Sequence, residues 1–179
     1  MNLPNIISLA RLLCVPLMVW LVLSGHLDVA FWVFVAAGIS DAVDGFLAKR
    51  FNWTTPLGGY LDPVADKALL VSIYVMLGAR GMLPGWLVAL VVLRDMVILG
   101  GAFLVIQASR DERMSPLYVS KANTVLQIVL AGYALALQGY EFADPGIEPA
   151  LVYAVAATTA ISGMGYVFKW GRKATGVPQ

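Results

Sequence analysis

The chain has 179 residues, of which 60% are hydrophobic and 13% are charged, and its formal net charge is +1. Soluble domains average about 45–50% apolar and about 25% charged residues, so this composition indicates an integral membrane protein. The single cysteine, Cys14, excludes an internal disulfide bond and a metal site made of cysteines alone.

Six apolar segments predict six transmembrane helices, because each is close to the ~20 residues that a bilayer requires. Turn-forming residues separate these segments, and the loops are too short to hold a further domain. We therefore expect an all-α membrane fold that forms one domain over residues 1–179. We expect the third helix to start at Pro63, or as early as Thr55. The expected spans are Asn5–Ser24, Val29–Arg50, Pro63–Ala79, Pro84–Ile106, Val119–Tyr140 and Pro149–Trp170.

The distribution of Lys and Arg predicts the orientation in the membrane. With a cytoplasmic N-terminus, ten basic residues lie on the cytoplasmic side and only Arg80 on the other, while Arg94 lies within a helix. Cytoplasmic loops carry such an excess of basic residues. The ten are Arg11, Lys49, Arg50, Lys67, Arg110, Arg113, Lys121, Lys169, Arg172 and Lys173.

Two pairs of aspartates lie in or beside the cytoplasmic halves of the second and third predicted helices. Asp41 and Asp44 are three residues apart and Asp62 and Asp66 are four apart, so each pair shares one helix face. An ionised carboxylate costs roughly 2.5–3.5 kcal/mol at the centre of a membrane helix, so such a cluster requires cations. Two divalent cations would balance the four charges, and carboxylate oxygens suit Mg²⁺ or Mn²⁺.

Three interpretations of this cluster are open from the residues alone. The acids are charges at helix ends exposed to water, or they line an ion or proton pathway of a transporter. In the third interpretation, two bound metal ions support phosphoryl chemistry. Small residues among the acids favour the third, because they let a bulky ligand approach the backbone, and neighbouring basic residues would contact a diphosphate. The small residues are Gly45, Ala48 and Gly58, and the basic residues are Lys49 and Arg50.

Residues 41–66 resemble the signature of the CDP-alcohol phosphotransferase family, D-x2-D-G-x2-A-R-x8-G-x3-D-x3-D. One position departs from it: Lys49 stands in place of the arginine and is followed by Arg50, which keeps the charge but loses the bidentate geometry of a guanidinium. The six-helix layout also agrees with the family. The matching residues are Asp41, Asp44, Gly45, Ala48, Gly58, Asp62 and Asp66.

The resemblance implies a reaction in which a CDP-linked donor loses CMP while its phosphatidyl group passes to an alcohol. It implies two divalent cations, Mg²⁺ or Mn²⁺, on the four aspartates, with Asp66 also the general base for the acceptor hydroxyl. It further implies a homodimer surrounded by membrane lipids and no nucleic-acid partner.

The opening segment is similar to the N-x-x-T/S-x-x-R start of bacterial phosphatidylglycerophosphate synthases and CMP-forming cardiolipin synthases. Asn5, Ser8 and Arg11 share one helix face and would line the nucleotide pocket. The alternative is a capped helix start with a snorkelling Arg11. The residues expected to bind the CDP donor are Asn5, Ser8, Gly45, Ala48, Lys49, Arg50 and Gly58.

The second half of the chain looks most similar to the CMP-forming cardiolipin synthases of mitochondria and related bacteria, over residues 93–95, 116–127 and 171–173. Ser120 and Asn123 stand where the glycerophosphate-using group has a glycine and a second lysine. This resemblance implies CDP-diacylglycerol as donor and phosphatidylglycerol as acceptor, with glycerol 3-phosphate as the alternative acceptor. It places the protein in the bacterial or mitochondrial inner membrane, with its site facing the cytoplasm or the matrix.

Four basic residues are candidates for binding the acceptor: Arg94, Lys121, Arg110 and Arg113. Arg94 lies beside Asp95, and the alternative interpretation is a structural pair whose two charges neutralise each other. Arg110 and Arg113 alternatively face anionic lipid headgroups from a polar loop.

Overall fold

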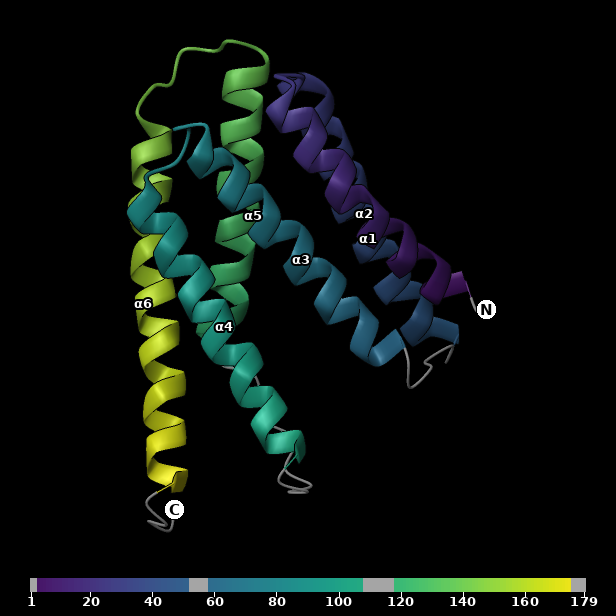
Figure 1. The fold of residues 1–179 in the computed structure, drawn as a ribbon, viewed down its shortest axis with the longest axis vertical. Coiled ribbons are helices and arrows are strands. Elements are labelled where there is room, and N and C mark those ends of the chain that lie inside the picture. Colours follow the sequence, from purple (N-terminus) through teal and green to yellow (C-terminus); the bar gives the residue numbers. More distant parts are fainter. Residues whose placement is uncertain (1–2, 52–57, 108–117, 175–179) are drawn as a thin grey trace. The chain divides into compact units, whose positions relative to one another are not determined.

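The computed structural model describes residues 3–51, 58–107 and 118–174, and the side chains of 10–41, 43, 65–100 and 119–166. In these ranges all regular secondary structure is α-helical (Figure 1). The helices are α1 (Leu3–Leu23), α2 (Leu27–Phe51), α3 (Gly58–Ala79), α4 (Gly85–Gln107), α5 (Tyr118–Gly139) and α6 (Ile147–Ala174).

The predicted helices are present, and most of their ends lie within two residues of the prediction; the start of α3 and the end of α6 differ more. Helix α3 begins at Gly58, which lies between the two predicted starts, Thr55 and Pro63. Pro63 lies in its second turn, where the missing N–H removes a single hydrogen bond of the helix. Helix α6 extends beyond Pro149–Trp170 in both directions and begins at Ile147. Pro149 falls in its first turn, where proline is tolerated.

Helices α1 and α3 end in the same hydrogen-bonded cap. At the end of α1, Gly25 adopts φ 82° and the N–H of His26 donates to the carbonyl oxygen of Leu21 at 3.0 Å. Gly81 closes α3 in this way with φ 73°. Only glycine adopts these left-handed angles without strain, which is why both helices stop at these positions. Glu141, with φ 53°, follows α5 in the same conformation.

The chain divides into two compact units. The first comprises Met1–Leu83 and Ala131–Pro145, and in it α1 packs against both α2 and α3. The second comprises Pro84–Leu130 and Gly146–Gln179, and in it α4 packs against α6. The expectation of one domain over residues 1–179 stays a prediction.

Each unit has an apolar interior. In the first unit, Val22, Tyr74 and Leu77 are fully buried. The end of α5 also fits closely here, because a Cβ atom added to Gly139 would lie 2.6 Å from the backbone nitrogen of Asp28. Leu87, Val91 and Val155 are fully buried in the second unit.

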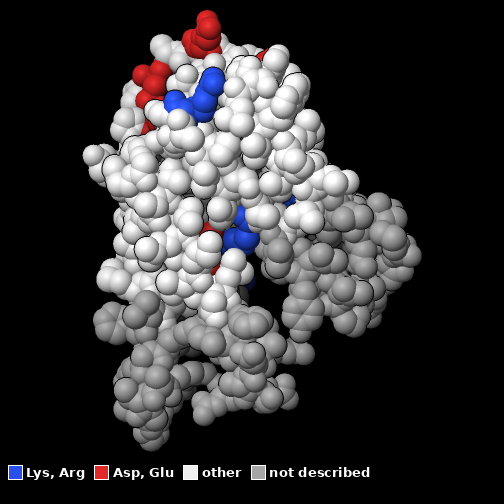
Figure 2. Space-filling model, in the orientation of Figure 1, with Lys and Arg blue, Asp and Glu red and all other residues white. Residues whose placement is uncertain are grey.

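The outer surface is unusually apolar. Leu13 and Leu93 are each 66% exposed, and on the face shown in Figure 2 the described residues carry charged side chains only in small groups. Two described stretches, Val119–Gly139 and Ile147–Tyr166, are long and apolar enough to cross a bilayer, and only 39% and 22% of them is buried. A shorter apolar stretch covers Ala10–Leu23. These features agree with a membrane location, and the number of six spans stays a prediction.

Candidate functional site

Two of the four aspartates meet at one nitrogen atom in the first unit. Nη1 of Arg11 lies 2.9 Å from Oδ1 of Asp41 and 2.5 Å from Oδ1 of Asp66. The three residues come from α1, α2 and α3. One residue from each predicted aspartate pair therefore contributes to a single ionic cluster, as expected if the two helices present their acids to a common site.

The three side chains differ in their exposure. The Arg11 side chain is 2% exposed, whereas those of Asp41 and Asp66 are 47% and 40% exposed. The guanidinium group therefore lies on the inner side of the cluster and the carboxylates lie at the surface. A snorkelling Arg11 would reach the surface, so that interpretation of the residue is wrong.

The other predicted members of this site have no described side chains. The backbone of α2 carries Asp44 about one helical turn after Asp41, and that of α3 carries Asp62 about one turn before Asp66. Their carboxylates, and the side chains of all the predicted donor-binding residues, lie outside the described part of the chain. These predictions concern Asn5, Ser8, Gly45, Ala48, Lys49, Arg50 and Gly58.

The cluster fits a hard divalent cation. The carboxylates of Asp41 and Asp66 contact the same nitrogen and so face one small region, and oxygen ligands are those that Mg²⁺ and Mn²⁺ prefer. Within the described side chains, no group of three or more acidic, histidine or cysteine residues gathers. The complete set of ligands therefore stays a prediction that includes Asp44 and Asp62.

A second polar cluster lies in the other unit, around Arg94. The Arg94 side chain is 3% exposed, and its Nη1 donates to Oδ1 of Asp95 at 2.6 Å. Its Nη2 donates to the hydroxyl oxygens of Ser120, at 2.5 Å, and Ser162, at 2.9 Å. The internally neutralised pair expected as one alternative is thus present, and it joins α4 to α5 and α6. A contact between Arg94 and an acceptor stays a prediction.

Asn123 lies on α5, and its fully buried side chain contacts α6. Its Oδ1 accepts hydrogen bonds from the hydroxyl groups of Thr158, at 2.7 Å, and Thr159, at 2.8 Å. Sequence reasoning missed these partners on α6. The available signal was the spacing of Thr158 and Ser162, which places two hydroxyl groups on one face of an apolar helix. Thr158 contacts Asn123, and Ser162 contacts Arg94.

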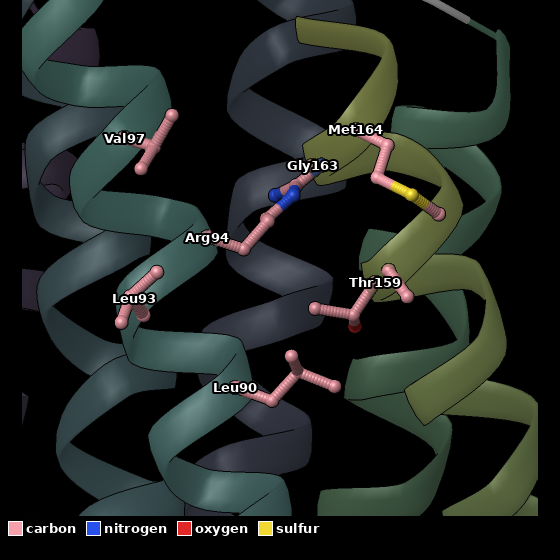
Figure 3. Close-up of a pocket in the computed structure, with 8 residues that line it drawn as sticks. Leu90, Leu93, Arg94, Val97, Thr159, Gly163 and Met164 are labelled. Atoms are coloured by element: carbon pink, nitrogen blue, oxygen red, sulfur yellow. The ribbon is translucent and has the colours of Figure 1, made fainter. Parts of the chain in front are cut away.

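A pocket of about 250 Å³ opens between α4 and α6, and Figure 3 shows the Arg94 side chain crossing it toward Gly163. The absence of a side chain at Gly163 makes room for the stem of Arg94, since an added Cβ would lie 3.7 Å from its Cγ atom. The lining residues are Leu90, Leu93, Arg94, Val97, Thr159, Ala160, Gly163 and Met164.

Lys121 is exposed near the start of α5. Of the two cationic side chains described in this unit, Lys121 is therefore the accessible one and Arg94 the buried one. Arg110 and Arg113 lie in residues 108–117, outside the described part of the chain.

Comparison with known proteins places these features in context. A family model described as "CDP-alcohol phosphatidyltransferase" matches residues 1–164. This match includes all four aspartates, Arg11, Arg94 and Lys121.

Individual relatives carry two kinds of name. The chain is 34% identical to a rice chloroplast "CDP-diacylglycerol–glycerol-3-phosphate 3-phosphatidyltransferase 1", over 95% of this chain and 57% of the relative. It is 31% identical to a rat "Cardiolipin synthase (CMP-forming)", over 96% of this chain and 62% of the relative. The chain thus spans less than two thirds of either protein. A Mycobacterium tuberculosis protein named "Probable phosphatidylglycerophosphate synthase" is 33% identical, over 99% of this chain and 86% of the relative.

Proposed function

We propose, because the chain belongs to the CDP-alcohol phosphatidyltransferase family, that it transfers a phosphatidyl group from CDP-diacylglycerol to an alcohol and releases CMP. The observation that carries this proposal is the cluster of Asp41 and Asp66 around one nitrogen of Arg11. It brings together one carboxylate from each half of the aspartate signature, at a partly exposed position where a substrate has access.

The reaction exchanges one phosphorus–oxygen bond for another. The hydroxyl oxygen of the acceptor bonds to the phosphorus of the phosphatidyl group, and the bond from this phosphorus to the CMP oxygen breaks. CMP leaves with the electron pair, and the hydroxyl proton moves to a carboxylate oxygen of Asp66. The family resemblance assigns this role to Asp66, whose side chain is 40% exposed and contacts Arg11 through one oxygen, so that it is accessible to an acceptor.

Asp41, Asp44, Asp62 and Asp66 would hold two divalent cations, Mg²⁺ or Mn²⁺. When bound, such ions neutralise negative charge on the diphosphate and its leaving group. The residues proposed to contact the CDP donor are the small and basic ones around the aspartates, together with two residues of α1. They are Asn5, Ser8, Gly45, Ala48, Lys49, Arg50 and Gly58.

For the acceptor, we favour phosphatidylglycerol, which would make the protein a CMP-forming cardiolipin synthase. Phosphatidylglycerol presents a free hydroxyl beside a phosphodiester with one negative charge. Exposed Lys121 offers one cation, while the charge of Arg94 is already balanced by Asp95. Asn123, which replaces a lysine of the glycerophosphate-using group, is buried and engaged by α6. These features support an acceptor with a single charge.

Glycerol 3-phosphate is the second candidate acceptor. It is favoured by relatives named for glycerol-3-phosphate or phosphatidylglycerophosphate, which are 33–34% identical to the chain. The rat relative named cardiolipin synthase is 31% identical, so identity does not separate the two acceptors. Arg110 and Arg113 are proposed as further contacts to either acceptor or to anionic headgroups.

The setting of the reaction is proposed from the same family. A homodimer in the bacterial or mitochondrial inner membrane, with its site facing the cytoplasm or the matrix, would meet soluble CMP and bilayer lipids together. Phosphatidylglycerol keeps both acyl chains in the bilayer, so it would enter the site laterally.

Parallel assays with purified protein test the acceptor. The protein is incubated with CDP-diacylglycerol, Mn²⁺ and either phosphatidylglycerol or glycerol 3-phosphate, and the lipid products are separated. We expect cardiolipin from the first mixture. Efficient formation of phosphatidylglycerophosphate from the second, with no cardiolipin from the first, would assign the protein to the other group.

A further inference from the structure

We propose that Arg11 is a positioning residue, whose buried guanidinium group fixes the carboxylates of Asp41 and Asp66 in the orientation in which they receive a divalent cation. This inference rests on the proposed function, because it assumes that these two aspartates are metal ligands.

Arg11 contacts both aspartates through one atom. A single atom, Nη1 of Arg11, contacts Oδ1 of Asp41 and Oδ1 of Asp66. Helix α1, which carries Arg11, packs against both α2 and α3, which carry the aspartates. One side chain therefore couples the rotamers of two acids that lie on different helices and are 25 residues apart in the sequence.

Arg11 and the two aspartates differ in exposure. Arg11 is 2% exposed behind carboxylates that are 47% and 40% exposed. A cation arriving from solvent reaches the carboxylates first and has no need to displace the guanidinium group. Such a displacement would leave a buried positive charge without its partners, which is strongly unfavourable. A carboxylate has two oxygens and several lone pairs, so it accepts a hydrogen bond and binds a metal at the same time.

The contacts of Arg11 with the two aspartates require a positively charged donor. Metal-binding side chains are commonly oriented by partners behind them, and removal of such partners typically lowers metal affinity or activity about 10–100-fold. The contacts to Asp41 and Asp66 both come from one nitrogen of Arg11. The ammonium group of a lysine, whose side chain is one atom shorter, therefore has the charge and the donors to make the same two contacts. A planar guanidinium fork is required where Arg11 also binds a group in a bidentate manner, as it would a diphosphate.

The test measures Mn²⁺ binding to the full chain in detergent, by electron paramagnetic resonance of free Mn²⁺. We expect Arg11→Met to weaken Mn²⁺ binding about 10–100-fold, and Arg11→Lys to retain affinity within about threefold, since a change of this kind preserves the charged hydrogen bonds. Arg80→Met is the matched control. Arg80 is an exposed arginine of the same unit that donates to the carbonyl oxygen of Leu23, and its loss leaves the affinity unchanged.

Turnover gives an independent readout. At saturating Mn²⁺, Arg11→Met lowers kcat for CMP release while the KM for CDP-diacylglycerol stays within about twofold, because Asp66 is misplaced but the donor contacts remain. Circular dichroism and size-exclusion chromatography establish that each variant is folded. If Arg11→Met does not fold, Arg11→Gln, which keeps a polar side chain without the charge, takes its place with the same expectations.

Three results would overturn the inference. Tighter Mn²⁺ binding by Arg11→Met would show that Arg11 competes with the cation. Equal losses in Arg11→Lys and Arg11→Met would show that the fork itself is needed. Unchanged affinity and kcat in Arg11→Met would show that the contact has no role in the site. If the wild-type protein itself binds no Mn²⁺, that result would contradict the metal site of the proposed function, and with it this inference.

Discussion

Substitutions of single residues distinguish the chemical step from the binding of metal and substrates. In our account, Asp66 receives the proton of the acceptor hydroxyl, and Asp41 only holds a cation. Both carboxylates contact Arg11 and are similarly exposed, so their surroundings alone do not distinguish these roles. Substitution with asparagine keeps the shape of each side chain and removes its charge.

We expect Asp66→Asn to lower kcat by at least about 100-fold, since general acid–base catalysis typically contributes 10²–10⁴-fold. Binding of CDP-diacylglycerol should largely survive. Asp41→Asn is the comparison, and it should weaken Mn²⁺ binding and turnover together. Steady-state CMP release, combined with Mn²⁺ titration, measures both effects. Wild-type turnover in Asp66→Asn would refute its role as the base.

Lys121 is the residue with which we test recognition of the acceptor. A hydrogen bond to a charged group contributes roughly 1.5–3 kcal/mol, which is about 10- to 150-fold in a binding constant. Lys121→Ala should therefore raise the KM for phosphatidylglycerol by this factor, with little change in the KM for CDP-diacylglycerol. Kinetics with each substrate varied in turn measure the two constants. Equal increases in both would show that Lys121 does not select the acceptor.

At the scale of helices, the contact of α5 with the start of α2 depends on a glycine. A Cβ atom at position 139 would meet the backbone of Asp28 at 2.6 Å, and backbone atoms cannot move aside as a flexible side chain would. At Gly38, in the interior of α2, an added Cβ has no neighbour within 4 Å among the atoms that the structure describes.

Gly139→Ala should therefore lower the free energy of unfolding by about 1–3 kcal/mol, as overpacking does. Gly38→Ala should raise it by up to about 1 kcal/mol, because alanine favours the helix. Thermal unfolding of the two variants in one detergent provides the comparison. Equal midpoints would show that α5 does not pack against α2 as described.

The Arg94–Asp95 pair connects α4 to α5 and α6, and its structural role is separable from a role in acceptor binding. Loss of one partner of a buried ion pair typically costs about 3–5 kcal/mol, whereas replacement of both by apolar residues is often neutral. We expect Arg94→Met to be destabilised by this amount and the double variant Arg94→Met, Asp95→Leu to recover most of the stability. If Arg94 also binds the acceptor, the recovered double variant will show a raised KM for phosphatidylglycerol in CMP-release assays.

At the scale of the whole molecule, much of the helical fold followed from the sequence because apolar runs and turn residues are local signals. Gly25 and Gly81 mark helix ends in both the sequence and the structure. The sequence placed the start of α3 only between Thr55 and Pro63, because proline is also common at the first position of a helix; the helix begins at Gly58.

The site was only partly predictable. The spacing of the aspartates predicted that the acids of two helices share a site, and the meeting of Asp41 with Asp66 agrees with it. The place of Arg11 between them was missed, because it depends on how α1 packs against two other helices. The hydrogen bonds from Arg94 to Ser120 and Ser162 join residues 26 and 68 positions apart, a distance over which no helical period gives a signal.

We propose a metal-dependent phosphatidyltransferase, and release of CMP is the most direct measurement of that activity. Purified protein in detergent, without any membrane gradient, is mixed with CDP-diacylglycerol and phosphatidylglycerol, and CMP is measured with excess chelator and after addition of Mg²⁺ or Mn²⁺. We predict no CMP with the chelator and rapid release after either metal is restored, because clustered carboxylates cannot bind a diphosphate without cations. Full release of CMP in excess chelator would contradict the metal site, and no release under any condition would contradict the proposed activity itself.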